Sequence, residues 1–117
     1  MEETLEEVSR QHVPIVGPAE VRDYLLRYPD IIELVPQVIR LARRDLPEAQ
    51  LILTVYQDPE IDEEEYLVIY ARFAHYDESV IEKIDTVMDK YLRQLVSREG
   101  WIQLTTDFRP PEDTYAV

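Results

Sequence analysis

Apolar residues recur every three to four positions in three stretches of the chain, which is the spacing that gives a helix one buried face. These stretches cover residues 18–28, 31–44 and 79–99. Pro18 stands at the start of the first stretch, where the missing N–H of proline costs a helix little. The spacing therefore predicts three helices.

Residues that commonly begin or end helices lie at the boundaries of these stretches. Asp30 is placed to cap the second helix, and either Asp77 or Ser79 is placed to cap the third. Gly100 follows the third helix, in a position where glycine often ends one. Pro36 falls inside the second helical pattern, so we expect a kink or a break there.

Three other stretches are rich in β-branched, aliphatic and aromatic side chains and predict strands over residues 49–57, 66–75 and 101–108. Side chains of the second strand alternate between two faces. One face carries Leu67, Ile69, Ala71 and Phe73, and the other carries Tyr66, Val68, Tyr70 and Arg72. The short polar connection 58–65 predicts an antiparallel hairpin between the first two strands.

The order helix, helix, strand, strand, helix, strand (α-α-β-β-α-β) predicts an α+β fold, with the helices packed on one face of a three-stranded sheet. We favour a fully antiparallel sheet of order 2-1-3; the alternative is order 1-2-3 with one parallel contact. We expect a single α+β domain over residues 17–109. Residues 1–16 are expected to form a mobile or extended arm, with 13–16 as an edge strand or a lead-in, and residues 110–117 a tail.

Acidic residues dominate the composition. The 117 residues include 25 acidic and 12 basic ones, for a net charge of −13, and residues 47–77 alone carry eight acidic residues and one basic residue. Such a chain repels phosphate groups, so we expect neither direct nucleic-acid binding nor attachment to an anionic membrane. The acidic N-terminus is unlike a secretory signal and the apolar stretches are too short to span a bilayer, so we expect a cytoplasmic location.

Side chains that could support catalysis are few and scattered. The two histidines, His12 and His75, fall in the presumed arm and at the end of a predicted strand. The chain has no cysteine, which excludes thiolate nucleophiles, disulfides and zinc ribbons, and its two glycines are too few for a phosphate-binding loop. We therefore expect a protein that is not an enzyme and carries no cofactor.

The acidic run between the first two strands is a candidate metal site. Asp58, Glu60 and Asp62 occupy alternate positions, and carboxylate oxygens are the ligands that Ca²⁺ and Mg²⁺ prefer. The run does not match an EF-hand loop, because Glu63 replaces the required glycine and Ile69 the bidentate glutamate. A solvated loop that keeps the protein soluble is the plainer interpretation.

Tyrosine and arginine side chains of the hairpin form a candidate binding surface. Tyr66, Tyr70 and Arg72 share one face of the second strand, and Tyr56 and Trp101 could join them opposite the helices. Tyr, Trp and Arg are enriched at binding hot spots. The alternative is that the first helix or the N-terminal arm covers this face.

These features favour a non-enzymatic, acidic protein–protein interaction module, comparable to an antitoxin or an adaptor in size and charge. Glu63, Glu64 and Glu65 would attract a basic protein, and self-association is the other partner class that we consider. The alternative function is binding of a cation or a small ligand by the acidic loop 58–65.

Two segments, VYQDPEIDEEEYLVIYARF (55–73) and GWIQLTTDFRPP (100–111), resemble parts of small acidic bacterial proteins that are uncharacterised. The resemblance implies a bacterial origin. It implies no mechanism, because no activity, cofactor or catalytic residue is assigned to those proteins.

Overall fold

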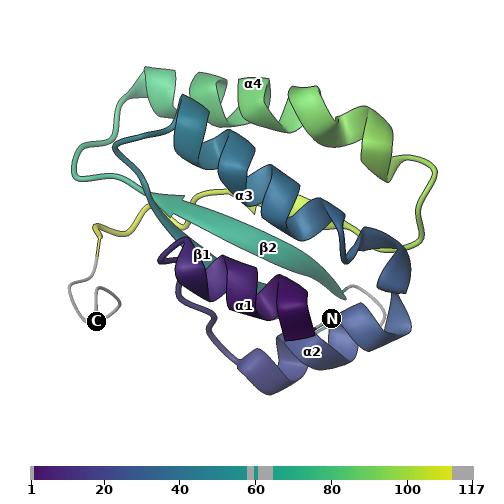
Figure 1. The fold of residues 1–117 in the computed structure, drawn as a ribbon. Coiled ribbons are helices and arrows are strands. Elements are labelled where there is room, and N and C mark those ends of the chain that lie inside the picture. The colour runs from purple at the N-terminus through teal and green to yellow at the C-terminus, as the bar shows by residue number, and fades with distance from the viewer. Residues whose placement is uncertain (1, 58–59, 61–64, 112–117) are drawn as a thin grey trace.

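A computed structural model describes residues 2–57, 60 and 65–111 (Figure 1). In chain order the elements are α1 (Glu2–Arg10), α2 (Pro18–Arg27), the 3₁₀ turn η1 (Pro29–Ile31), α3 (Leu34–Asp45), β1 (Gln50–Gln57), β2 (Glu65–Arg72), α4 (Glu78–Leu95) and β3 (Ile102–Thr105). The predicted α+β class is therefore confirmed. None of the helices built from the described residues has the length and apolar character needed to cross a membrane.

The sheet has the order β1-β2-β3, with β1 antiparallel to β2 and β2 parallel to β3. The favoured order 2-1-3, fully antiparallel, was wrong, and the alternative order 1-2-3 is the one that the chain adopts. The physical reason lies at the outer edge of β1. There Val16 N donates to Leu53 O at 2.9 Å, and Leu53 N donates to Pro14 O at 3.0 Å. Because this edge is already occupied, β3 pairs beside β2.

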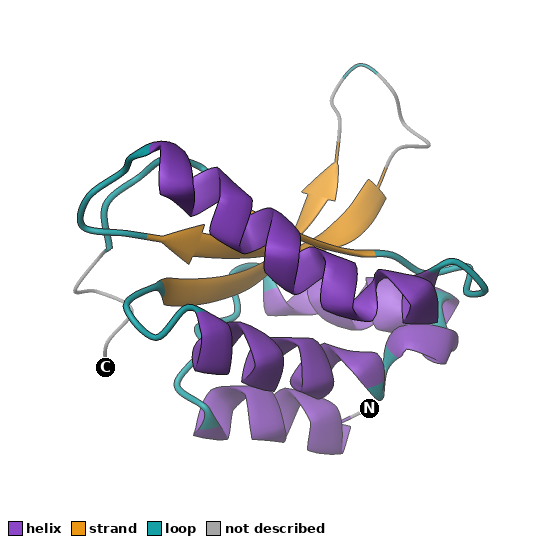
Figure 2. Cartoon of the chain, turned by 90° about the horizontal axis from the view of Figure 1, so that it is seen from above, coloured by secondary structure: helices purple, strands orange, loops and turns teal. Residues whose placement is uncertain are grey.

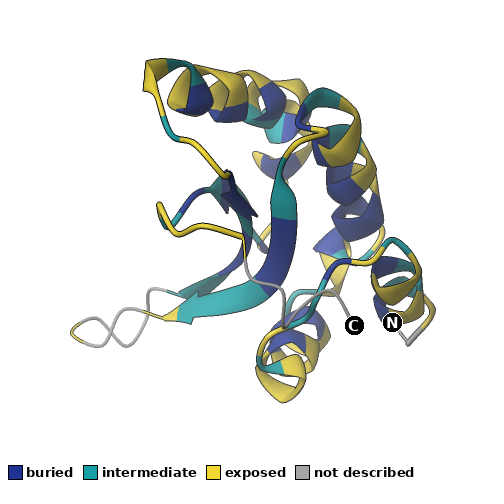
Figure 3. Ribbon diagram, turned by 90° about the vertical axis from the view of Figure 1, so that its left-hand side faces the viewer, coloured by how far each residue is buried: buried dark blue, intermediate teal, exposed yellow. Residues whose placement is uncertain are grey.

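All four described α-helices lie on one side of the sheet, as Figures 2 and 3 show from two directions. Their apolar faces form one hydrophobic cluster with the side chains that point toward them from the strands. Those strand residues are Leu51 and Leu53 of β1, Leu67, Ile69 and Ala71 of β2, and Ile102 and Leu104 of β3. Burial of this cluster is the main driving force for the fold.

The N-terminal residues differ from the expected mobile or extended arm. Residues Glu2–Arg10 form helix α1, which packs on α3 and buries Leu5 and Val8. Beyond it, Ile15 forms a parallel bridge with Leu53 of β1. The segment 13–16 is thus a minimal edge strand, one of the two interpretations that the sequence allowed.

The junction between α2 and α3 also differs from expectation. Helix α3 begins at Leu34, so Pro36 lies in its first turn, where helix N–H groups have no partner within the helix and proline needs no kink. Asp30 does not cap α3. Its carboxylate instead accepts hydrogen bonds from the backbone N–H groups of Glu99, at 2.7 Å, and Gly100, at 3.3 Å. This contact ties the end of α4 to the α2–α3 junction.

Candidate functional site

The sheet face opposite the helices, which we call the open sheet face, is the main candidate site. Strand register places on it Gln50, Ile52, Thr54 and Tyr56 of β1, Tyr66, Val68, Tyr70 and Arg72 of β2, and Gln103 and Thr105 of β3. Ile52 and Val68 are buried but stand outside the hydrophobic cluster on the helix side. Within the described ranges no helix lies across this face, although Met88 of α4 meets its β3 edge by accepting from Gln103 Nε2 at 3.3 Å. The N-terminal segment reaches the β1 side of the face at Val16, whose carbonyl accepts from Thr54 Oγ1 at 2.8 Å.

Aromatic rings gather at the end of this face that leads into the β1–β2 loop. Tyr56 and Tyr66 are directly opposite in the ladder, and their rings stack with centroids 5.0 Å apart and an interplanar angle of 23°. Both side chains are half-buried. Trp101 immediately precedes β3 and lies next to Tyr66 by register. It packs against the hydrophobic cluster, and its Nε1 donates to Gln103 Oε1 at 2.9 Å. We call Tyr56, Tyr66 and Trp101 the aromatic row.

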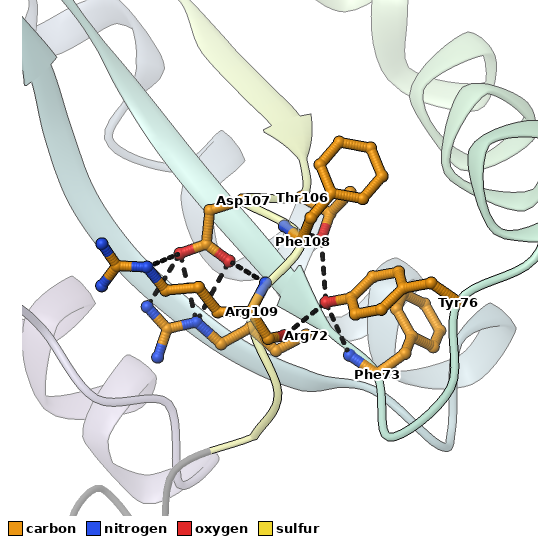
Figure 4. A network of polar contacts seen from close by, with 7 residues as sticks. All are labelled: Arg72, Phe73, Tyr76, Thr106, Asp107, Phe108 and Arg109. Atoms are coloured by element: carbon orange, nitrogen blue, oxygen red, sulfur yellow. Dashed lines mark hydrogen bonds and ion pairs between the residues drawn. The ribbon is translucent and has the colours of Figure 1, made fainter.

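Arg72 anchors the other end of the face through an ion pair with Asp107 (Figure 4). Its Nη2 lies 2.8 Å from Asp107 Oδ2, its Nε donates to both carboxylate oxygens, and the residue is only 5% exposed. Partial burial by itself would raise the pKa of Asp107, but the hydrogen bonds from Arg72 and from the backbone N–H of Arg109, together with the positive charge of Arg72, outweigh it and the pKa is lowered. Arg72 thus fixes the segment after β3, and it offers a partner little surface.

Tyr76 holds the same segment from the other side (Figure 4). Its hydroxyl accepts from Phe73 N at 3.1 Å, lies 3.2 Å from Thr106 Oγ1 and donates to Arg109 O. Phe108, between these contacts, has a φ of 59° and is 64% exposed. The two sets of contacts together keep residues 106–109 against the sheet.

A small depression lies on the open face beside Tyr70. It has a volume of about 270 Å³ and is lined by Val16, Ile52, Thr54, Tyr70, Arg72, Asp107 and Arg109. Burial, followed by the nearby Asp107 carboxylate, raises the pKa of Tyr70, so its hydroxyl stays protonated at neutral pH. The volume of this depression is below that of typical small-molecule pockets and corresponds to a recess for a single side chain.

The outer edge of β3 is occupied by a side chain of α4. Tyr91 donates from its hydroxyl to Ile102 O at 3.1 Å, and the same hydroxyl is hydrogen-bonded by the backbone of Leu104. Burial strongly raises the pKa of Tyr91 and keeps the hydroxyl protonated. Residues 14–16 occupy the opposite edge of the sheet at Leu53. Both edges are thus partly closed, which leaves the open face as the accessible surface of the sheet.

The structure separates the other residues that the sequence singled out. Glu65 pairs with Arg27 on the helix side of the sheet, away from Tyr66 and Tyr70. Glu63 and Glu64 lie outside the described residues, as do the weak metal candidates Asp58 and Asp62, while Glu60 is exposed. In the part of the chain that the structure describes, no group of three or more potential metal ligands converges.

His75 is exposed beyond β2 and lines a cavity of about 190 Å³ with residues that include Asp77 and Ser79. Asp77 already caps α4 by accepting from Ser79 N at 2.8 Å. His12 is also exposed, and lies at the C-terminal end of α1. Asp77 and Ser79 thus have a structural role at the start of α4, and His12 and His75 are exposed to solvent.

The sequence analysis did not identify Asp107 and Arg109 as residues of the candidate site. The signal was available: continuing the alternation of β3 past Thr105 puts position 107 on the open face, in line with Arg72 across the sheet. Comparison of the chain with protein-family models, with curated proteins and with solved structures finds no match, so its function must be argued from this geometry.

Proposed function

We propose that this protein is a non-enzymatic interaction module that binds a basic protein through its open sheet face. The observation that carries the proposal is the arrangement of Tyr56, Tyr66 and Tyr70 on a sheet face that no described helix covers. Tyrosine provides a large, amphipathic contact surface with few rotatable bonds, which suits it to binding interfaces.

Charge favours a basic partner over a second copy. The chain has a net charge of −13, and the residues that connect the two tyrosine-bearing strands are the most acidic part of the sequence. Two such molecules repel each other, whereas a basic surface is attracted and its encounter rate rises. Nucleic acids are repelled for the same reason, and we place the module in the cytoplasm.

The backbone hydrogen bonds already formed at both sheet edges favour binding of a partner on the open sheet face over binding at an edge. The Tyr91 hydroxyl is hydrogen-bonded to the backbone of Ile102 and Leu104 in β3. Residues 14–16 are hydrogen-bonded to the backbone of Leu53 in β1. An added strand would need these groups free, since strand addition depends on backbone hydrogen bonds. A partner therefore docks its side chains on the open face.

The first test is affinity capture of the tagged protein from a lysate of its source organism, at low and at moderate salt. We expect one stoichiometric basic protein whose recovery falls as salt rises, because charge screening weakens the attraction. Recovery of the protein alone under both conditions would count against the proposal.

The captured partner then allows a kinetic test of the loop. The triple substitution Glu60→Gln, Glu63→Gln and Glu64→Gln removes three charges and leaves the ion pair between Glu65 and Arg27 intact. We expect a slower association rate with a weaker salt dependence.

A matched control neutralises three exposed acids of α4 on the helix side, through Glu78→Gln, Glu82→Gln and Asp85→Asn. Because these charges lie away from the open face, this variant should lose less of the association rate. Equal losses of association rate in the two variants would show that the rate depends on net charge alone and not on the position of the loop.

A further inference from the structure

The stacked pair of Tyr56 and Tyr66 offers a specific kind of contact surface. Its ring centroids lie 5.0 Å apart with an interplanar angle of 23°, and both side chains are half-buried at the end of the open sheet face. The faces of aromatic rings carry negative electrostatic potential and attract cations placed over them.

The fold already uses such a contact between its own residues. The guanidinium carbon of Arg27 lies 5.8 Å from the ring centroids of both Tyr24 and Tyr28. Arginine suits this geometry better than lysine, because its guanidinium is planar, stacks flat on a ring and is more weakly hydrated than an ammonium group.

We propose that the aromatic row binds arginine side chains of the basic partner, with the guanidinium stacked on Tyr56 and Tyr66. This inference rests on the proposed function and adds the chemistry by which the partner is recognised. The acidic net charge of the chain brings any basic surface to the sheet, and the aromatic row then distinguishes arginine from lysine.

Trp101 makes the proposal directly measurable, since it is the single tryptophan of the chain and lies beside Tyr66 by register. Hexa-arginine and hexa-lysine peptides carry the same charge, and each can be titrated while the Trp101 fluorescence is followed. We expect hexa-arginine to bind about two- to fivefold more tightly, which is the ratio that corresponds to an exposed cation–π contact.

Substitutions of the tyrosines test whether they cause the difference in affinity between hexa-arginine and hexa-lysine. Tyr66→Leu should remove the preference for hexa-arginine, while Tyr66→Phe, which keeps the ring, should retain it. Tyr28→Leu removes a half-buried tyrosine on the helix side and serves as the control, with the preference unchanged. Thermal melts check that each variant is folded, and Tyr56→Leu provides a second removal of the stack.

The outcomes separate the two proposals. Equal affinity for the two peptides, with both weakened by the triple substitution at Glu60, Glu63 and Glu64, would overturn the arginine preference and leave the proposed function standing. A preference that survives both Tyr66→Leu and Tyr56→Leu would also overturn it. No fluorescence change with either peptide at low salt would overturn both proposals.

Discussion

His12 shows how one residue's backbone conformation concealed helix α1 in the sequence. It has a φ of 61°, and the backbone bonds around it, Val13 N to Val8 O and His12 N to Ser9 O, form a Schellman motif. That position usually holds glycine, so the sequence lacked the expected stop signal. Buried Val8 and Val13 supply the hydrophobic contact that accompanies the motif.

Gly100 is required because of close packing. A Cβ built there would lie 2.9 Å from side-chain atoms of Ile31, which is fully buried. We expect Gly100→Ala to lower the free energy of unfolding by about 1–3 kcal/mol, the usual cost of overpacking a core. Urea denaturation measures this.

The smaller side chain in Ile31→Val should offset part of that loss, so we expect a favourable coupling energy in a double-mutant cycle. Additive effects of Gly100→Ala and Ile31→Val would mean that the two positions do not press against each other.

Among the elements, α4 both connects β2 to β3 and protects β3. Replacing Tyr91 with Phe removes the hydroxyl that donates to Ile102 O and leaves that carbonyl without this bond. Since Tyr91 is buried, we expect Tyr91→Phe to cost about 1–3 kcal/mol of stability. Hydrogen exchange should show faster exchange at Leu104 than in the wild-type protein, and unchanged exchange there would contradict this role.

The sequence predicted the helices and strands far better than their packing and the order of the strands in the sheet. Helices α2, α3 and α4 follow from periodic apolar positions, and strands β1, β2 and β3 follow from runs of β-branched, aliphatic and aromatic residues; both signals act locally. Among the α1 residues whose burial is described, Leu5 and Val8 are the buried ones, too few for a period to stand out. Strand order depended on which edge of β1 was free, and residues 14–16 decided that through two backbone bonds.

The candidate site was predictable to the extent that it depends on alternation within one strand. Tyr66, Tyr70 and Arg72 share a face as expected. The burial of Arg72 was not predictable, because it depends on Asp107 arriving from 35 residues away along the chain. Glu65 was assigned to the partner surface, although the same alternation points it to Arg27 on the helix side.

At the scale of the whole molecule, the response to acid follows from the lowered pKa of Asp107. The native carboxylate takes up a proton less readily than the unfolded one, so its contribution to stability is present above the ordinary pKa of about 3.9 and is lost as the pH falls through the lower native value. We expect Asp107→Asn to destabilise the protein by about 1–3 kcal/mol at neutral pH.

The difference in unfolding free energy between Asp107→Asn and the wild-type protein should shrink as the pH is lowered through this range. Asp45, whose pKa is lowered first by a hydrogen bond from Lys90, is a comparison site on the helix side. A difference that stays constant down to the acid transition would show that the charge of Asp107 contributes nothing to stability.

The short bridge formed by residues 14–16 has a consequence for how the protein behaves when its N-terminus is lost. Removal of residues 2–16 would bare the outer edge of β1, a strand rich in leucine, isoleucine and valine, together with the surface of α3 that α1 covers. Such an edge templates strands from other copies, so we expect proteolytic trimming to make this acidic protein prone to fibril formation. Light scattering of the trimmed protein against salt would follow this change, since screening removes the remaining repulsion.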